Sequence, residues 1–267
     1  MEESDTSYLQ PGRWPSDGWP AQQPATISSM TSASDWHWHA RAWMARQRWA
    51  ATRDRLARWM ASIDAAPDVP QELILLGGSA GWMMSPAFLA RFKSILLVDI
   101  DPWAPRLFRL RHGATLRRHA VRLDFLCGDV HELLDQALAT QPQACVLFDN
   151  FLGLDSIYTR NLEVTARRMR GIRQRMRGRL WGSVHDRLSG PGTANWRDAA
   201  CWARDWTSQS GHELPQQAFF ASVQAQGPWL DHHTEHVLPP GLNTHLIAWP
   251  IVPGRWHWLE AGWVEGR

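Results

Sequence analysis

The chain has 267 residues, 44% of them hydrophobic, which suits one large globular domain or two small ones. No stretch approaches the roughly 18 consecutive apolar residues of a membrane-spanning helix, and the acidic, polar start does not resemble a secretion signal, so we expect a cytoplasmic protein with no membrane partner. The net charge is +2, and every basic residue except Lys93 is arginine. Because these arginines are spread over the whole chain, bulk charge identifies no partner.

The N-terminal part of the chain divides into two segments. Residues 1–34 contain four prolines among serine, glutamine, threonine and glycine, with few aliphatic residues, and this composition predicts a disordered tail. Residues 35–63 lack glycine and proline and repeat apolar side chains at helical spacing, which predicts one long helix or a broken pair. We expect this helical segment, residues 35–70, to cover the sheet or the cleft, because its tryptophans need burial.

From residue 71 to residue 267 the pattern is that of one α/β domain. Short apolar runs alternate with helix-like segments, as in parallel sheets built from strand–helix–strand units. Further along, the pattern predicts helices at 197–210 and 215–226 and a hairpin of two extended stretches at 234–238 and 244–249. The five predicted strands are Leu73–Leu76, Ile95–Val98, Val121–Cys127, Ala144–Phe148 and Leu180–Val184.

The cysteines give no sign of a disulfide or a zinc site. Cys127, Cys145 and Cys201 are widely separated and lie in apolar or mixed segments. We therefore expect three buried, reduced thiols.

Small and acidic residues follow the first four predicted strands. The first strand ends in a turn of small residues, 77–81, where the backbone can pass close to a ligand. The second, third and fourth strands end in Asp99, Asp129 and Asp149. Because ligands of open α/β folds bind beyond the carboxyl ends of the strands, these acids are candidate ligand contacts. The spacing G-x-G-x-x-G of dinucleotide-binding proteins is not met.

Four segments within residues 72–186 together resemble the four successive motifs of class I S-adenosylmethionine-dependent methyltransferases. These segments are ELILLGGSAG, ILLVDIDP, FLCGDV and VLFDNFLG. The resemblance implies a doubly wound, mostly parallel, seven-stranded α/β sheet with a C-terminal antiparallel hairpin. It also implies S-adenosylmethionine as the cofactor and an O or N nucleophile, most simply that of a small molecule, as the methyl acceptor.

The resemblance also assigns roles to individual residues. The glycine-rich turn would contact the methionine part of the cofactor, and Asp99, next to Ile100, would hold the ribose. Asp129 and Val130 would contact the adenine. Asp149 and Asn150 would line the acceptor side, with Asp149 also near the cofactor. The contacts in the turn would come from Gly77, Gly78, Ser79 and Gly81.

Two departures from the family pattern leave other functions open. Ser79 replaces the middle glycine of the usual turn, and Leu75 replaces an acid common in the first strand. These departures suit a non-catalytic binding module on the same fold. An aminopropyltransferase similar to spermidine synthase is a further alternative, although the acidic amine-binding signature expected near the fourth strand is missing.

Three other features are candidates for function. His185, at the end of the fifth predicted strand, is a candidate general base facing the acceptor. Eight arginines between Arg160 and Arg179 suit an RNA methyltransferase, although a solvated helix face also explains them. The segment 232–236 contains H-x-x-E-H, but the prolines that follow disfavour a helix, so we predict surface histidines and no metal site.

Overall fold

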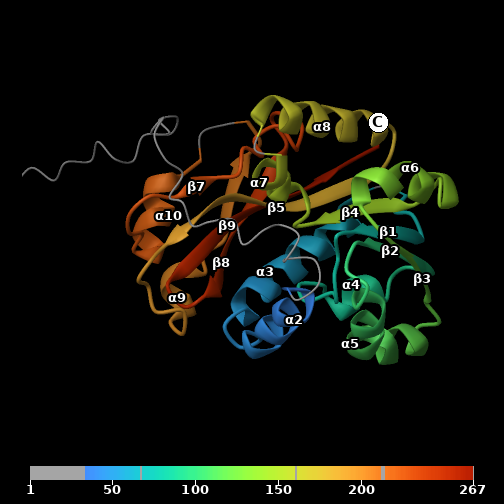
Figure 1. Cartoon of the computed structure of the whole chain (residues 1–267), viewed down its shortest axis with the longest axis horizontal. Helices are drawn as coiled ribbons and strands as arrows, with labels where there is room; N and C mark the ends of the chain where they lie inside the picture. Colours follow the sequence, from blue (N-terminus) through green and yellow to red (C-terminus); the bar gives the residue numbers. More distant parts are fainter. Residues whose placement is uncertain (1–33, 67, 160, 212–213, 267) are drawn as a thin grey trace, which may run out of the picture.

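The centre of the molecule is one twisted sheet (Figure 1). The computed structural model describes residues 34–66, 68–159, 161–211 and 214–266. The strands are ordered β3-β2-β1-β4-β5-β9-β8-β6, and β7 pairs with β5. They are β1 (Glu72–Leu76), β2 (Ser94–Asp99), β3 (Arg122–Cys127), β4 (Cys145–Asp149), β5 (Trp181–Pro191), β6 (Trp206–Gln209), β7 (Leu230–Asp231), β8 (Asn243–Val252) and β9 (Arg255–Val264).

Strands β1 to β5 are parallel and confirm the predicted doubly wound α/β fold, but the sheet has nine strands among the described residues rather than the predicted seven. The strands β1, β2 and β4 are almost entirely buried, which explains their continuous apolar sequences. Leu76 lies opposite both Val98 and Phe148, so the ends of these three strands are level. The residues that follow them therefore meet at one edge of the sheet.

Helices cover both faces of the sheet (Figure 1). Helices α2 to α5 contribute to one apolar cluster, α6 and α8 to a second, and α9 and α10 to a third. The α-helices are α2 (Ser34–Met44), α3 (Ala50–Ala61), α4 (Pro86–Leu89), α5 (Ala104–Arg118), α6 (Val130–Thr140), α7 (Asp155–Thr159), α8 (Leu162–Arg175), α9 (Ala199–Trp202) and α10 (Gln216–Val223). Short 3₁₀ turns, η2 (Ser62–Ala65) and η3 (Leu152–Leu154), complete the set.

The predicted N-terminal helix is a pair, α2 and α3, that packs on the sheet. Trp49 and Trp59 are buried in the same cluster as β1 and β2. The expectation that the tryptophans of this segment need burial is wrong for Trp36 and Trp43, which are 59% and 57% exposed. The predicted tail, residues 1–34, lies outside the described residues except for Ser34, where α2 begins.

The predicted hairpin is in the wrong place. The two hairpin strands are β8 and β9, which are antiparallel and joined at Pro253 and Gly254. Residues 234–238 form no strand. Strand β8 continues through Pro250, where the register with β9 shifts, because proline lacks the N–H that a regular ladder requires. The antiparallel hairpin itself, at the C-terminal end, is confirmed.

Two smaller expectations also need correction. The predicted helix at 197–210 is only α9, followed by strand β6, whereas the helix predicted at 215–226 is α10. Cys145 is buried as expected, but Cys127 and Cys201 are exposed, and all three are free thiols. Among the described residues, every helix is too short or too polar to cross a membrane.

Candidate cofactor site at the carboxyl edge of the sheet

The turn after β1 is tied to the neighbouring strand. The N–H of Gly77 donates to the carbonyl of Val98 at 2.9 Å, and the N–H of Gly81 donates to the carbonyl of Gly78 at 2.7 Å. Gly77, Ser79 and Gly81 all have positive φ angles, of 72°, 47° and 66°. Ser79 is the only one of the three with a side chain, so it carries backbone strain of a kind that concentrates at functional sites.

The glycines of this turn are required by close packing within the protein. A Cβ atom on Gly78 would lie 2.7 Å from the side chain of Leu75, and one on Gly81 would lie 2.5 Å from Nε2 of His112. The imidazole of His112 also lies 3.0 Å from the carbonyl oxygen of Gly81. Burial lowers the pKa of His112 to about 4, so it is neutral at pH 7. The turn is thus fixed from both sides.

Asp99 joins the turn to the end of β2. Its Oδ2 accepts a hydrogen bond from the N–H of Ser79 at 2.7 Å, and its Oδ1 accepts one from the N–H of Asp101 at 2.9 Å. Burial raises the pKa of Asp99 above its usual range. The two sequence motifs, the turn and the acid, therefore form one site.

Two side chains next to Asp99 fit a nucleoside ligand. The Oγ of Ser79 is buried and has no hydrogen-bond partner among the described residues. The side chain of Ile100 is 62% exposed although it directly follows a fully buried strand. A polar atom without a partner and an open apolar side chain suit the polar and flat parts of a nucleoside.

The third strand delivers Asp129 to the start of α6. Its carboxylate accepts a hydrogen bond from the N–H of His131 at 2.7 Å and so caps the helix. Val130, the first residue of α6, is buried. The helix cap accounts for Asp129 structurally, and its predicted adenine contact remains a prediction.

Asp149, at the end of β4, lies where a negative charge is unfavourable. The residue is only 8% exposed. Burial, with a smaller contribution from the negative charge of Asp99, raises the pKa of Asp149 to about 7. The carboxyl group therefore changes its charge near neutral pH.

This raised pKa predicts that Asp149→Asn stabilises the protein at alkaline pH. Between pH 4 and pH 7 the folded wild type binds more protons than the unfolded chain, so its stability falls as the pH rises through this window. The free energy of unfolding of Asp149→Asn, relative to wild type, should rise by about 2–3 kcal/mol between pH 5 and pH 8. Urea unfolding of both proteins at pH 5 and at pH 8 measures this difference in the free energy of unfolding. A difference that is the same at both pH values would contradict the raised pKa of Asp149.

Asn150 connects the ends of β4 and β5. Its Nδ2 lies 3.3 Å from Oδ2 of Asp186, and its Oδ1 accepts the N–H of Asp186 at 3.1 Å. Its φ angle is 51°, a conformation that asparagine tolerates better than most residues. Asn150 therefore holds Asp186, a contact that the sequence did not indicate.

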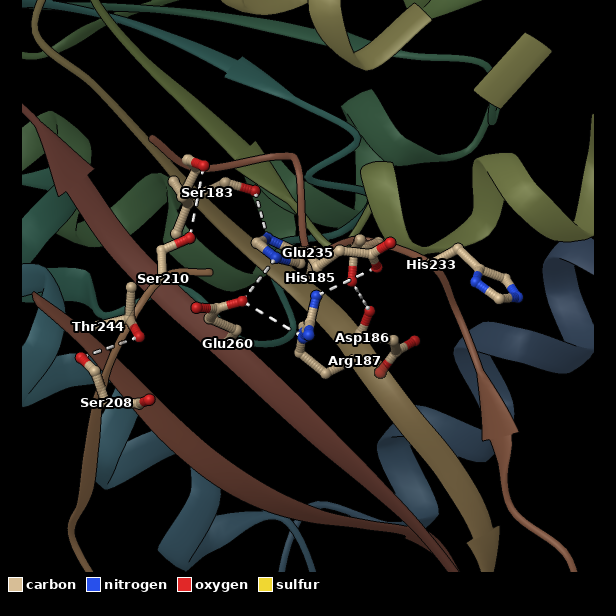
Figure 2. A network of polar contacts seen from close by, with 12 residues as sticks. Ser183, His185, Asp186, Arg187, Ser208, Ser210, His233, Glu235, Thr244 and Glu260 are labelled. Carbon is tan, nitrogen blue, oxygen red and sulfur yellow. Dashed lines mark hydrogen bonds and ion pairs between the residues drawn. The ribbon is translucent and has the colours of Figure 1, made fainter. Parts of the chain in front are cut away.

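His185 has no open face for an acceptor in this structure. It is 0% exposed. Its Nδ1 lies 2.9 Å from Oγ of Ser183, and its Nε2 lies 3.4 Å from Oε2 of Glu260. Figure 2 shows Glu260 between His185 and Arg187. The predicted role as a general base facing the acceptor is thus corrected: alternation along β5 turns His185 and the next residue, Asp186, to opposite faces.

A histidine of α2, which sequence analysis did not single out, reaches this edge of the sheet. Nε2 of His39 lies 2.5 Å from Oδ2 of Asp101, and its Nδ1 accepts a hydrogen bond from Nε1 of Trp82 at 2.9 Å. The contact links α2 to the residues after both β1 and β2. A histidine within a helix gives no sequence signal for such a contact, because its partners lie 43 and 62 residues away.

The arginines of the 160–179 segment lie mainly on α8, as predicted. Two of them have acidic partners: Arg168 lies 2.8 Å from Asp155, and Arg175 lies 2.9 Å from Asp135. Others line a cavity of about 470 Å³ beside the C-terminal strand, away from the glycine-rich turn. Of the arginines of this segment that the structure describes, none therefore contributes to the candidate cofactor site described above.

No protein-family profile matches the chain, and no curated protein matches it. Solved structures similar to the chain include the following three. A candidate O-methyltransferase from Nostoc punctiforme is 12% identical with a TM-score of 0.40, over 79% of this chain and 56% of that one. An O-methyltransferase family protein from Burkholderia thailandensis is 12% identical with a TM-score of 0.44, over 91% and 64%. Cofactor-bound Rv0187 from MTB is 16% identical with a TM-score of 0.36, over 88% and 94%. The chain thus spans less than two thirds of the first two.

Proposed function

We propose that the chain transfers a methyl group from S-adenosylmethionine to an oxygen or nitrogen nucleophile. The observation that carries the proposal is the hydrogen bond from Ser79 to Asp99, which joins the glycine-rich turn and the acid after β2 into one site. The order of the parallel strands, the C-terminal antiparallel hairpin and the four motifs agree with the class I arrangement that the sequence resembles.

The residues of this edge suit the parts of the cofactor. The turn at 77–81 would face the methionine part, with the unpartnered Oγ of Ser79 available to it. The carboxylate of Asp99 would accept hydrogen bonds from the ribose hydroxyls, since each of its oxygens can accept more than the one bond it has. The exposed side chain of Ile100 would pack against the adenine.

When bound, the sulfonium supplies an already activated methyl group. The chain would mainly align the acceptor with the methyl carbon and the sulfur, because alignment contributes most of the rate in such a displacement. A base of the protein would take the proton that the acceptor atom loses when it becomes methylated. At pH values above about 7 the ionised Asp149 is a candidate for that base.

Calorimetric titration with S-adenosylmethionine and with S-adenosylhomocysteine tests cofactor binding directly. We expect both to bind with micromolar affinity and one site per chain. Transfer of label from methyl-labelled cofactor to fractionated cell extract then tests the reaction. Binding without any labelled product would favour the non-catalytic module, and no binding at high micromolar concentration would refute the proposal.

A further inference from the structure

A buried carboxylate and two imidazoles converge beyond the carboxyl end of β4. Asp186 lies on β5, His257 on β9, and His232 directly after β7. One possible ligand atom from each of the three lies within 4.8 Å of the other two. Asp186 and His232 are both 1% exposed, and His257 is half-buried. The prediction of surface histidines at 232–236 is therefore wrong for His232.

In the described part of the chain, the buried carboxylate of Asp186 is paired with a histidine rather than with an arginine or a lysine. Among the described residues, its only recorded ion-pair partner is His257, whose Nδ1 lies 2.8 Å from Oδ1. The other carboxylate oxygen, Oδ2, lies 3.3 Å from the neutral amide of Asn150. Buried charges in proteins are normally paired with an opposite charge or bound to a metal ion. A metal ion between Asp186 and the two imidazoles would replace the proton of His257 as the charge that balances Asp186.

The contacts of His232 prepare one ring nitrogen for a metal ion. Its Nδ1 lies 2.7 Å from the carbonyl oxygen of Gly153, which can only accept, so Nδ1 carries the proton. Nε2 therefore holds a lone pair and lies 2.9 Å from the hydroxyl of Ser189. Metal-binding histidines usually donate their other N–H to a carbonyl or carboxylate in this way.

We infer that Asp186, His232 and His257 bind a divalent transition-metal ion. Two imidazoles and one carboxylate match the donor set of zinc and non-haem iron sites with open positions. Nδ1 of His257 and Oδ1 of Asp186 lie 2.8 Å apart. Because a carboxylate only accepts, this Nδ1 carries a proton, which binding of an ion would release so that the nitrogen can act as a ligand. Magnesium is disfavoured because it prefers oxygen ligands. The inference is independent of the proposed methyl transfer.

Metal titration of the full chain without a histidine tag tests the site. After treatment with a chelator and dialysis, Co²⁺ is added and followed by its visible absorption, and Zn²⁺ is then added as a competitor. We expect one ion per chain, displacement by Zn²⁺, and no competition by Mg²⁺ at similar concentrations. Failure to bind one equivalent of either transition metal would overturn the inference.

Variants then locate the ion. His257→Gln and His232→Gln should each weaken binding by more than about 100-fold, since even the partners that orient ligands are worth 10–100-fold. His257 is half-buried, so its variant should fold even where His232→Gln does not. The matched control is His233→Gln, which alters a second, less buried group formed by Asp231, His233 and Glu235. Lost binding in the control with full binding in His257→Gln would overturn the inference.

Discussion

Replacing Asp99 with asparagine is expected to weaken S-adenosylmethionine binding by about 100-fold. If the ribose hydroxyls each donate a hydrogen bond to this carboxylate, each bond to a charged group contributes about 1.5 kcal/mol, and the pair about 3 kcal/mol. The substitution also disturbs the turn, because both oxygens of Asp99 accept backbone N–H groups, of Ser79 and Asp101. An amide must point its own N–H at one of these donors.

The same change should lower the free energy of unfolding by about 1–3 kcal/mol, the cost of leaving a buried donor without a partner. Calorimetry at a temperature where the variant is folded, as checked by circular dichroism, separates the two effects. Asp124→Asn is the matched control: this acid lies on the neighbouring strand β3, is exposed, and pairs only with Arg122 among the recorded ion pairs of the described residues. Unchanged cofactor affinity in folded Asp99→Asn would contradict the proposed ribose contact.

The parallel half of the fold could be predicted because its signal is local. Buried parallel strands consist of continuous apolar residues, and β1, β2 and β4 were predicted within one or two residues of their bounds. The strands of the antiparallel half could not be predicted in the same way. Pro250 lies inside β8 at a register shift, so its sequence suggests the end of a strand. Strand β9 has large apolar side chains on both faces and lacks the alternation that marks a half-buried strand.

The candidate site divides in the same way. The turn at 77–81 and Asp99 are found by motif because each follows its own strand directly. The contacts of Asp186 depend on tertiary structure: it meets Asn150, 36 residues before it, and His257, 71 residues after it. The sequence points to His185 because histidine suits proton transfer. Residues adjacent on a strand face opposite sides, however, and the apolar pattern of β5 does not show which side is open.

Replacing Gly81 with alanine is expected to have the largest effect on stability. The new Cβ would lie 2.5 Å from Nε2 of His112 and 2.8 Å from Cε2 of Phe108. Both side chains belong to α5, and both are buried. Overpacking of this kind costs about 1–3 kcal/mol, and alanine at the φ angle of 66° adds about 1–2 kcal/mol. The free energy of unfolding should fall by about 2–5 kcal/mol.

Two further variants separate the steric cost from the backbone cost. Gly178→Ala is the control for the backbone: its φ is 74°, and a Cβ there would meet nothing within 4 Å, so we expect a loss of only about 1–2 kcal/mol. His112→Ala makes room for the added methyl group, so Gly81→Ala should cost less in that background than in wild type. Urea unfolding of all four variants, including the double variant, measures the difference. If Gly81→Ala lowers the free energy of unfolding equally in both backgrounds, the clash between the new methyl group and His112 does not contribute to the cost. Such a result would contradict the role of His112 in fixing the turn.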